Sequence, residues 1–153
     1  MIGTPSPEVV PVSPSEFDAA VESYREALQA FLNGDWQPVA AHFSRREDVT
    51  LANPFGPPAK GWPDVEATIA AAASNFTGGS CTFEEVSRYA TPDLAYVLQL
   101  EHAQVRLNGM STPAPSTLRV TMIFRREGAE WKVAHRHADP ITSPRPATTI
   151  LDA

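Results

Sequence analysis

The chain has 153 residues, a formal net charge of −6 at pH 7 and a single cysteine. This length fits one domain with its own core, the lone cysteine excludes an intrachain disulfide, and the interleaving of the few Lys and Arg with acidic residues argues against a nucleic-acid partner. The N-terminal segment has no basic region and no continuous apolar stretch, so we expect a cytoplasmic protein with no membrane partner.

Proline marks the organisation of the chain, because the 15 prolines gather at both ends and in two internal loops. Residues 1–12 and 141–153 are rich in Pro, Ser and Thr and have little to bury, so we predict flexible N-terminal and C-terminal arms. The folded domain should then span residues 13–140.

The first predicted element is an amphipathic helix. Ser13 is placed as its N-cap, and Glu16 can reach back to close a capping box. Gly34 favours the helix end, after which Asp35 can cap a second, short helix. The apolar positions recur at steps of three and four residues, and they are Phe17, Val21, Tyr24, Leu28, Phe31 and Leu32.

A short β-prone run at residues 49–53 precedes a loop at 53–61, where proline and glycine disfavour regular structure. Pro63 then opens a third helix, whose alanine-rich sequence continues to residue 76. Gly78-Gly79 is expected to end this helix.

From residue 82 onward the hydrophobic period changes to two, which is typical of strands. Four strands are predicted, at residues 82–90, 94–107, 116–126 and 130–139. Because short connections join them, they should form an antiparallel meander, and the helices must cover one of its faces. The predicted class is α+β, with three N-terminal helices packed on an antiparallel sheet.

Four segments, together with this order of elements, resemble the NTF2-like superfamily and, more narrowly, its SnoaL-like and ketosteroid-isomerase-like group. They are GDWQPVAAHF, ANPFGPPAKG, TLRVTMIFRREG and WKVAHRHADP. The resemblance runs from about residue 15 to residue 140. It implies a cone, in which a strongly curved sheet wraps round the helices and leaves a hollow at its mouth, and homodimers through the outer sheet face. It does not choose a function, because the superfamily contains isomerases, dehydratases, cyclases, transport factors and association modules.

Steroid isomerisation is disfavoured by the residues at the matching positions. The resemblance implies an aspartate base directly before the proline of a D-P-x-G loop, and here Asn53 stands there. The tyrosine donor would fall near Ala27, with Tyr24 almost one turn earlier, and the protonated aspartate would fall near Met122. An amide cannot accept the proton that this chemistry moves.

The last strand carries the candidate catalytic residues. His135, His137 and Asp139 share strand parity with Trp131 and Val133, so they are expected to point into the hollow, with Arg136 on the opposite face. His137 is the predicted proton carrier, and His135 and Asp139 support it. Alternatively, either histidine bonds a backbone carbonyl or buttresses the sheet rim. A β-bulge would change this assignment.

Arg119 and Glu101 are candidate ligand-binding residues on neighbouring strands. A register that brings them together is easy to draw, and the pair would be charge-assisted. Arg119 could then receive a substrate carboxylate or enolate oxygen, or the pair could be purely structural at a dimer surface.

The loop residues Asn53 and Phe55, with Trp62 and Trp131, are the remaining candidate ligand-binding residues. They would line the mouth and wall of the hollow and orient a neutral oxygenated ligand. Alternatively, Phe55 and Trp62 cap the core. The H-x-H spacing of His135 and His137 permits a metal but is unspecific, so we expect neither metal nor cofactor.

Two functions remain open. One is a cofactor-independent acid–base enzyme of the cyclase, dehydratase or hydratase type, acting on a small, mainly apolar, oxygenated molecule. The other is a non-catalytic ligand-binding or dimerisation module. An enzyme should lose turnover in His137→Ala while ligand affinity stays within about tenfold, whereas a binding module has no turnover to lose.

Overall fold

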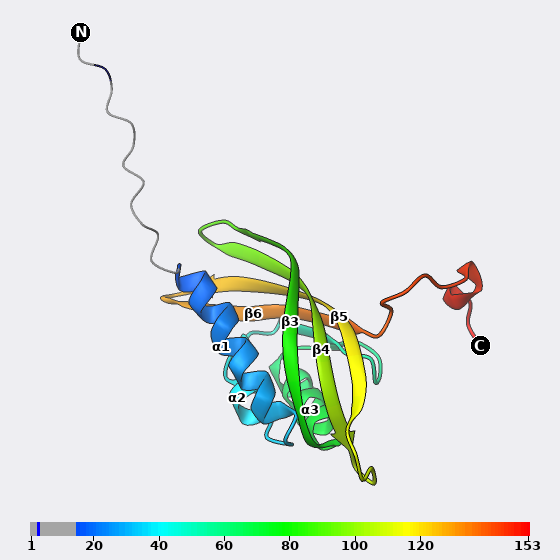
Figure 1. Ribbon diagram of the computed structural model, residues 1–153. Helices are drawn as coiled ribbons and strands as arrows, with labels where there is room; N and C mark the ends of the chain where they lie inside the picture. Colours follow the sequence, from blue (N-terminus) through cyan, green and yellow to red (C-terminus); the bar gives the residue numbers. More distant parts are fainter. Residues whose placement is uncertain (1–2, 4–14) are drawn as a thin grey trace.

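The computed structural model describes residue 3 and residues 15–153. Three helices pack against one sheet of six strands (Figure 1). The helices are α1 (Glu16–Phe31), α2 (Gln37–Ala40) and α3 (Trp62–Ala73). The strands are β1 (Thr50–Ala52), β2 (Ala59–Lys60), β3 (Phe76–Ala90), β4 (Leu94–Leu107), β5 (Ala114–Glu127) and β6 (Glu130–Asp139). The predicted α+β class is confirmed.

Helix α1 begins two residues later than the sequence predicts. Ser15 is the N-cap, its side chain accepts a hydrogen bond from the backbone N–H of Asp18, and the Asp18 carboxylate accepts from the backbone N–H of Ser15. The capping box is therefore closed by Asp18 in place of Glu16. The predicted cap Ser13 and the predicted arm at residues 1–12 lie outside the described residues, apart from Gly3.

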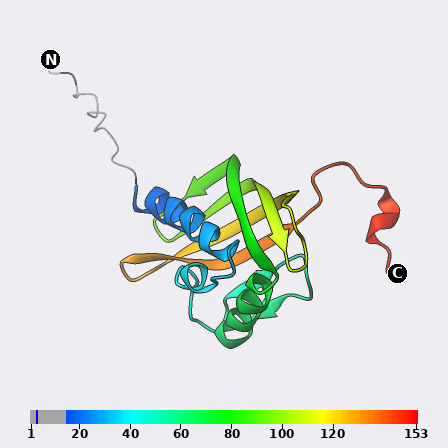
Figure 2. The same ribbon diagram turned by 60° about the horizontal axis from the view of Figure 1, so that its bottom comes forward.

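The sheet has the order β2-β1-β6-β5-β4-β3 and curves around the helices (Figures 1 and 2). Strands β3 to β6 form the predicted antiparallel meander. Strand β1, however, pairs parallel to β6, with Thr50 opposite His135, and antiparallel to β2. The sheet is therefore mixed, because β1 enters it beside the last strand of the chain.

The glycine pair at residues 78–79 belongs to β3 and does not end α3. The α-helix ends at Ala73, and the strand begins at Phe76. A Cβ atom on Gly79 would lie 2.4 Å from the backbone oxygen of Gln104. Glycine is needed there because β3 and β4 approach each other closely, so a pattern interpreted as a helix stop marks tight strand packing instead.

A bulge in β6 determines which residues face the helices. Ile123 of β5 pairs with His135, but the next residue, Phe124, pairs with Val133, so Ala134 is an extra residue in β6. An extra residue inverts the alternation of side chains beyond it. Val133 before the bulge is buried, and beyond it the buried residues are Arg136 and Ala138.

The segment after β6 leaves the body of the molecule (Figure 1). Residues 141–153 contain one short 3-10 helix, Ala147–Ile150, and its side chains are exposed. None of the helices within the described part of the chain is long and apolar enough to cross a membrane.

Candidate functional site

A largely apolar cavity lies between the helices and the concave face of the sheet. Its volume is about 80 Å³. Three of its lining residues, Tyr24, Asn53 and Arg136, have polar side chains. The others are Leu28, Phe31, Val39, Phe43, Leu51, Pro54, Phe55, Ile69, Ala72, Phe76, Leu118 and Ala138. We call this space the first chamber.

A second chamber of about 60 Å³ adjoins the first. The two share five lining residues, which are Leu28, Phe31, Phe76, Leu118 and Arg136. The lining residues found only in the second chamber are Leu32, Cys81, Glu101, Ala103, Val105 and Ser116. Arg136 therefore stands at the boundary between two mainly apolar spaces.

Arg136 of β6 and Glu101 of β4 form a buried, two-pronged ion pair across β5. The Nη1 atom of Arg136 donates to Oε2 of Glu101 at 2.8 Å, and Nη2 donates to Oε1 at 2.7 Å. Both residues are buried. Burial alone would lower the pKa of Arg136, but the adjacent Glu101 carboxylate offsets this and leaves the pKa above its ordinary value. The guanidinium is therefore charged and firmly oriented.

Gln99 fixes the carboxylate from the other side. Its Nε2 donates to Oε2 of Glu101 at 2.9 Å, and its Oε1 accepts from Nη2 and Nε of Arg25 at 2.8 and 3.1 Å. Arg25 in turn forms an ion pair with Glu85 at 3.0 Å. A chain of polar contacts thus runs from the cavity between α1 and the sheet to the surface, and it holds Glu101 in one orientation.

Tyr24 offers a buried hydroxyl to the first chamber. Only 1% of its surface is exposed, and its ring centroid lies 5.7 Å from the Arg136 guanidinium carbon. The Arg136 side chain lies within hydrogen-bonding reach of the Tyr24 hydroxyl, and no enclosed side-chain polar atom among the described residues lacks a partner. Tyr24 is also a lining residue of the first chamber. Burial raises the pKa of Tyr24 to about 12, so the phenol keeps its proton at neutral pH and can donate it in a hydrogen bond.

Cys81 lines the second chamber as a neutral thiol. Burial raises its pKa to about 12, and the nearby Glu101 carboxylate acts in the same direction. Because the thiolate is the nucleophilic form, this cysteine is an unreactive wall residue at neutral pH.

The structure places His135 and His137 on the outer face of the sheet, contrary to the inward orientation that the sequence predicts. The extra residue at Ala134 inverts the alternation, so these side chains share a face with Thr121 and Ile123 of β5. Nδ1 of His135 lies 2.7 Å from Oγ1 of Thr50. Their roles in proton transfer stay predictions.

Asp139 and Arg119 also lie on the outer face. Nη2 of Arg119 donates to Oδ2 of Asp139 at 2.8 Å, and Nε2 of His137 lies 3.1 Å from the same oxygen. The predicted pairing of Arg119 with Glu101 is wrong, because the register places Leu100 opposite Arg119 and turns Glu101 inward. Arg119 forms a cross-strand pair, but with a different partner.

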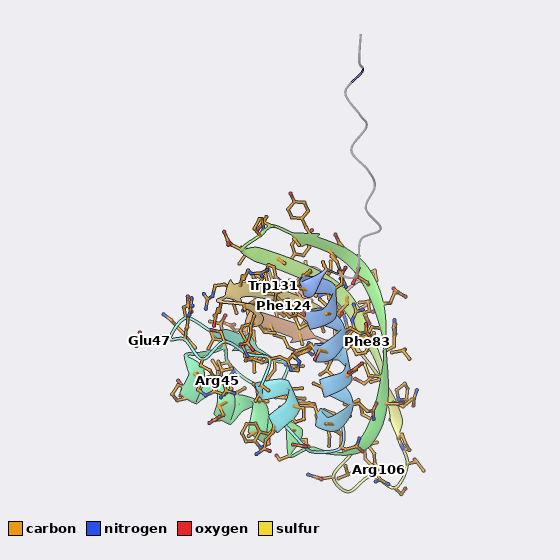
Figure 3. All side chains as sticks on the ribbon, turned by 90° about the vertical axis from the view of Figure 1, so that its left-hand side faces the viewer. Arg45, Glu47, Phe83, Arg106, Phe124 and Trp131 are labelled. Carbon is orange, nitrogen blue, oxygen red and sulfur yellow. The ribbon has the colours of Figure 1, made fainter. Side chains whose placement is uncertain are left out.

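Two of the four remaining candidates lie at the first chamber. Asn53 and Phe55 line it, Phe55 is 61% exposed, and Oδ1 of Asn53 accepts from the backbone N–H of Phe55 at 3.0 Å. Trp62 lies under the Arg45 guanidinium at 3.9 Å. Trp131 faces the helices beside Phe124 near the start of α1 (Figure 3). Neither tryptophan lines a chamber.

Sequence analysis missed the roles of Tyr24, Gln99 and Arg136. One available signal was the alternation along β4, because Gln99 and Glu101 lie on the same face of the strand as the buried Val97 and Val105. Two polar residues at consecutive inward positions require partners, which implies a buried cation nearby. Within residue 3 and residues 15–153, no three His, Cys, Asp or Glu side chains are placed to hold a metal ion.

Helices enclosed by a curved, open sheet, with a hollow between them, define the NTF2-like class of α+β proteins. Within this class, the model of the SnoaL-like domain matches residues 21–142, and the chain belongs to that family. SnoaL-like domains are a family that binds small molecules. No curated protein matches the chain.

Solved structures with the same fold have little sequence in common with this chain. An NTF2-like superfamily protein from Salmonella enterica is 12% identical, with a TM-score of 0.73 over 88% of this chain and 94% of its own. An NTF2-like protein from Streptomyces avermitilis, provisionally named a dehydratase, is 21% identical, with a TM-score of 0.71 over 85% and 96%. A ketosteroid isomerase-like protein from Erwinia carotovora atroseptica is 17% identical, with a TM-score of 0.69 over 88% and 100%. These similarities establish the fold alone.

Proposed function

We propose that this protein binds a small, mainly apolar, neutral molecule through one oxygen atom that accepts hydrogen bonds from Tyr24 and Arg136. The observation that carries the proposal is the position of the Tyr24 hydroxyl, which lies beside the Arg136 side chain and in the wall of an apolar chamber that both residues line. Because this phenol keeps its proton at neutral pH, it can donate a hydrogen bond to a ligand oxygen in the chamber.

The charge balance of the chamber favours a neutral ligand. Arg136 is already paired with Glu101 through two hydrogen bonds, so together they have no net charge. A carboxylate ligand would lose its hydration without gaining an unpaired cation. A carbonyl oxygen loses far less hydration and can still accept from the phenol and from the guanidinium N–H groups that Glu101 does not use.

The geometry supports binding more than acid–base catalysis. The predicted proton carriers His135 and His137 face away from the chambers, and the Tyr24 phenol and the Cys81 thiol hold their protons at neutral pH. Asn53, which stands where a steroid isomerase would have its base, is an amide. A cyclase, dehydratase or hydratase would need a base that reaches the ligand, whereas the Glu101 carboxylate is occupied by Arg136 and Gln99.

Titration calorimetry with dipentyl ketone tests this proposal. We expect Tyr24→Phe to lower the affinity about 5- to 10-fold, the value of one neutral hydrogen bond, without lowering the unfolding midpoint. Arg119→Met, on the outer face, is the matched control and should bind as the wild type does. Equal affinity of wild type and Tyr24→Phe would refute the proposed contact.

A further inference from the structure

We infer that the ligand has its accepting oxygen near the middle of its length, with apolar arms of comparable size on either side. Internal ketones, and compact molecules with the same layout, belong to this class, whereas fatty acids and terminal alcohols or aldehydes do not. This inference rests on the proposed function and specifies which molecules it serves.

The position of the donors carries the inference. Arg136 lines both chambers, while Tyr24 lines only the first and Glu101 only the second. The cation is thus at the junction, with mainly apolar space on both sides. A ligand oxygen held there leaves apolar volume to fill in two directions, and the volumes of about 80 and 60 Å³ are similar.

Neither chamber offers a further cation as the partner of an anionic ligand end. Apart from Arg136, no Lys, Arg or His lines either space within the described part of the chain. The walls away from the junction are formed by side chains such as Val39, Ile69 and Ala72 in the first chamber and Ala103 and Val105 in the second. A charged terminal group would be desolvated there without compensation.

Apart from Arg136, the side chains around the junction of the two chambers are apolar, so an aliphatic chain or a ring of the ligand can extend past them. The rings of Phe31 and Phe76 are 5.4 Å apart and inclined by 50°, and Leu28 and Leu118 complete the shared wall. These side chains contact the centre of the ligand, on either side of its oxygen, and Arg136 provides the directional contact.

Two isomeric ketones distinguish this layout from a cavity that holds the oxygen at one end. Dipentyl ketone and methyl nonyl ketone have the same formula and nearly the same apolar area. When methyl nonyl ketone binds, there are two possibilities. Either its oxygen reaches Arg136 and one chamber stays unfilled, or its alkyl chain fills both chambers and the oxygen loses its hydrogen-bond partners. We expect dipentyl ketone to bind about tenfold more tightly, measured by calorimetry on the full chain.

A variant in the second chamber adds an independent readout. Ala103→Leu narrows the second chamber, so it should weaken dipentyl ketone several-fold and diethyl ketone, whose arms are much shorter, by clearly less. Circular dichroism and the unfolding midpoint verify the fold of the variant.

The affinities of the two isomeric ketones separate a failure of this inference from a failure of the proposed function. Equal affinities for the two isomers, or tighter binding of methyl nonyl ketone, would overturn the central position of the oxygen while leaving the proposed function intact. Absence of binding by both isomers to folded protein would overturn the proposed function and this inference with it.

Discussion

Each face of the sheet formed by β4, β5 and β6 holds an arginine–carboxylate pair, and the pairs differ in surroundings more than in geometry. The shortest N···O distance is 2.7 Å for Arg136–Glu101 on the inner face and 2.8 Å for Arg119–Asp139 on the outer face. The inner side chains are 10% and 6% exposed, and the outer ones 49% and 17%. Distance alone therefore says little about what a pair does, because burial decides how strongly each charge depends on its partner.

This difference assigns the two faces different tasks. The inner pair presents a fixed hydrogen-bond donor to apolar chambers, whereas water and salt screen the outer pair. The outer pair also contacts His137, so the outer face is a solvated polar surface around that histidine. The following changes separate the faces experimentally, from the largest expected effect to the smallest.

Removing the inner carboxylate should have the largest effect. Glu101→Gln leaves the Arg136 guanidinium buried without a counter-charge, so we expect the free energy of unfolding to fall by about 3–5 kcal/mol. Urea denaturation followed by circular dichroism measures this change. Asp139→Asn on the outer face is the matched control and should cost about 1 kcal/mol or less. Similar losses in both variants would contradict the contrast between the faces.

Removing the outer cation should have a small effect. Arg119→Met should change the free energy of unfolding by at most about 1 kcal/mol, because the pair is exposed. The affinity for dipentyl ketone should not change, since Arg119 lines neither chamber. A large loss of affinity, measured by calorimetry, would instead favour a ligand role for Arg119.

The smallest expected effect is on the pH dependence of stability, through His135 on the outer face. Partial burial, with His137 nearby, lowers the pKa of His135 below its ordinary value. The unfolded chain therefore binds a proton at His135 more readily than the folded chain does. The contribution of His135 to stability is present above its ordinary pKa and is lost as the pH falls through its lower pKa in the folded state. We expect the unfolding midpoint of the wild type to drop more between about pH 8 and about pH 5 than that of His135→Gln. Equal drops would show that His135 is not responsible.

Periodicity was sufficient to predict most of the elements but not the direction of every side chain. Alternation identified the four long strands, steps of three and four residues identified α1, and Pro63 with the alanine-rich sequence after it identified α3. On β5, Val120, Met122 and Phe124 alternate without interruption, and all three are buried.

The site could not be predicted because it depends on one inserted residue. Ala134 has no glycine or proline beside it to indicate a bulge, yet it inverts the orientation of Arg136 and of both histidines. The parallel pairing of β1 with β6 likewise depends on packing between segments far apart in the chain. The homodimer implied by the family resemblance stays a prediction.

The carbonyl carbon resonance of bound, isotopically labelled dipentyl ketone tests the central claim most directly. Hydrogen bonds to a carbonyl oxygen move this resonance downfield, so it should appear downfield of its position in hexane and return part of the way in Tyr24→Phe. A resonance at the hexane position, or one that Tyr24→Phe leaves unchanged, would show that Tyr24 does not hold the ligand oxygen.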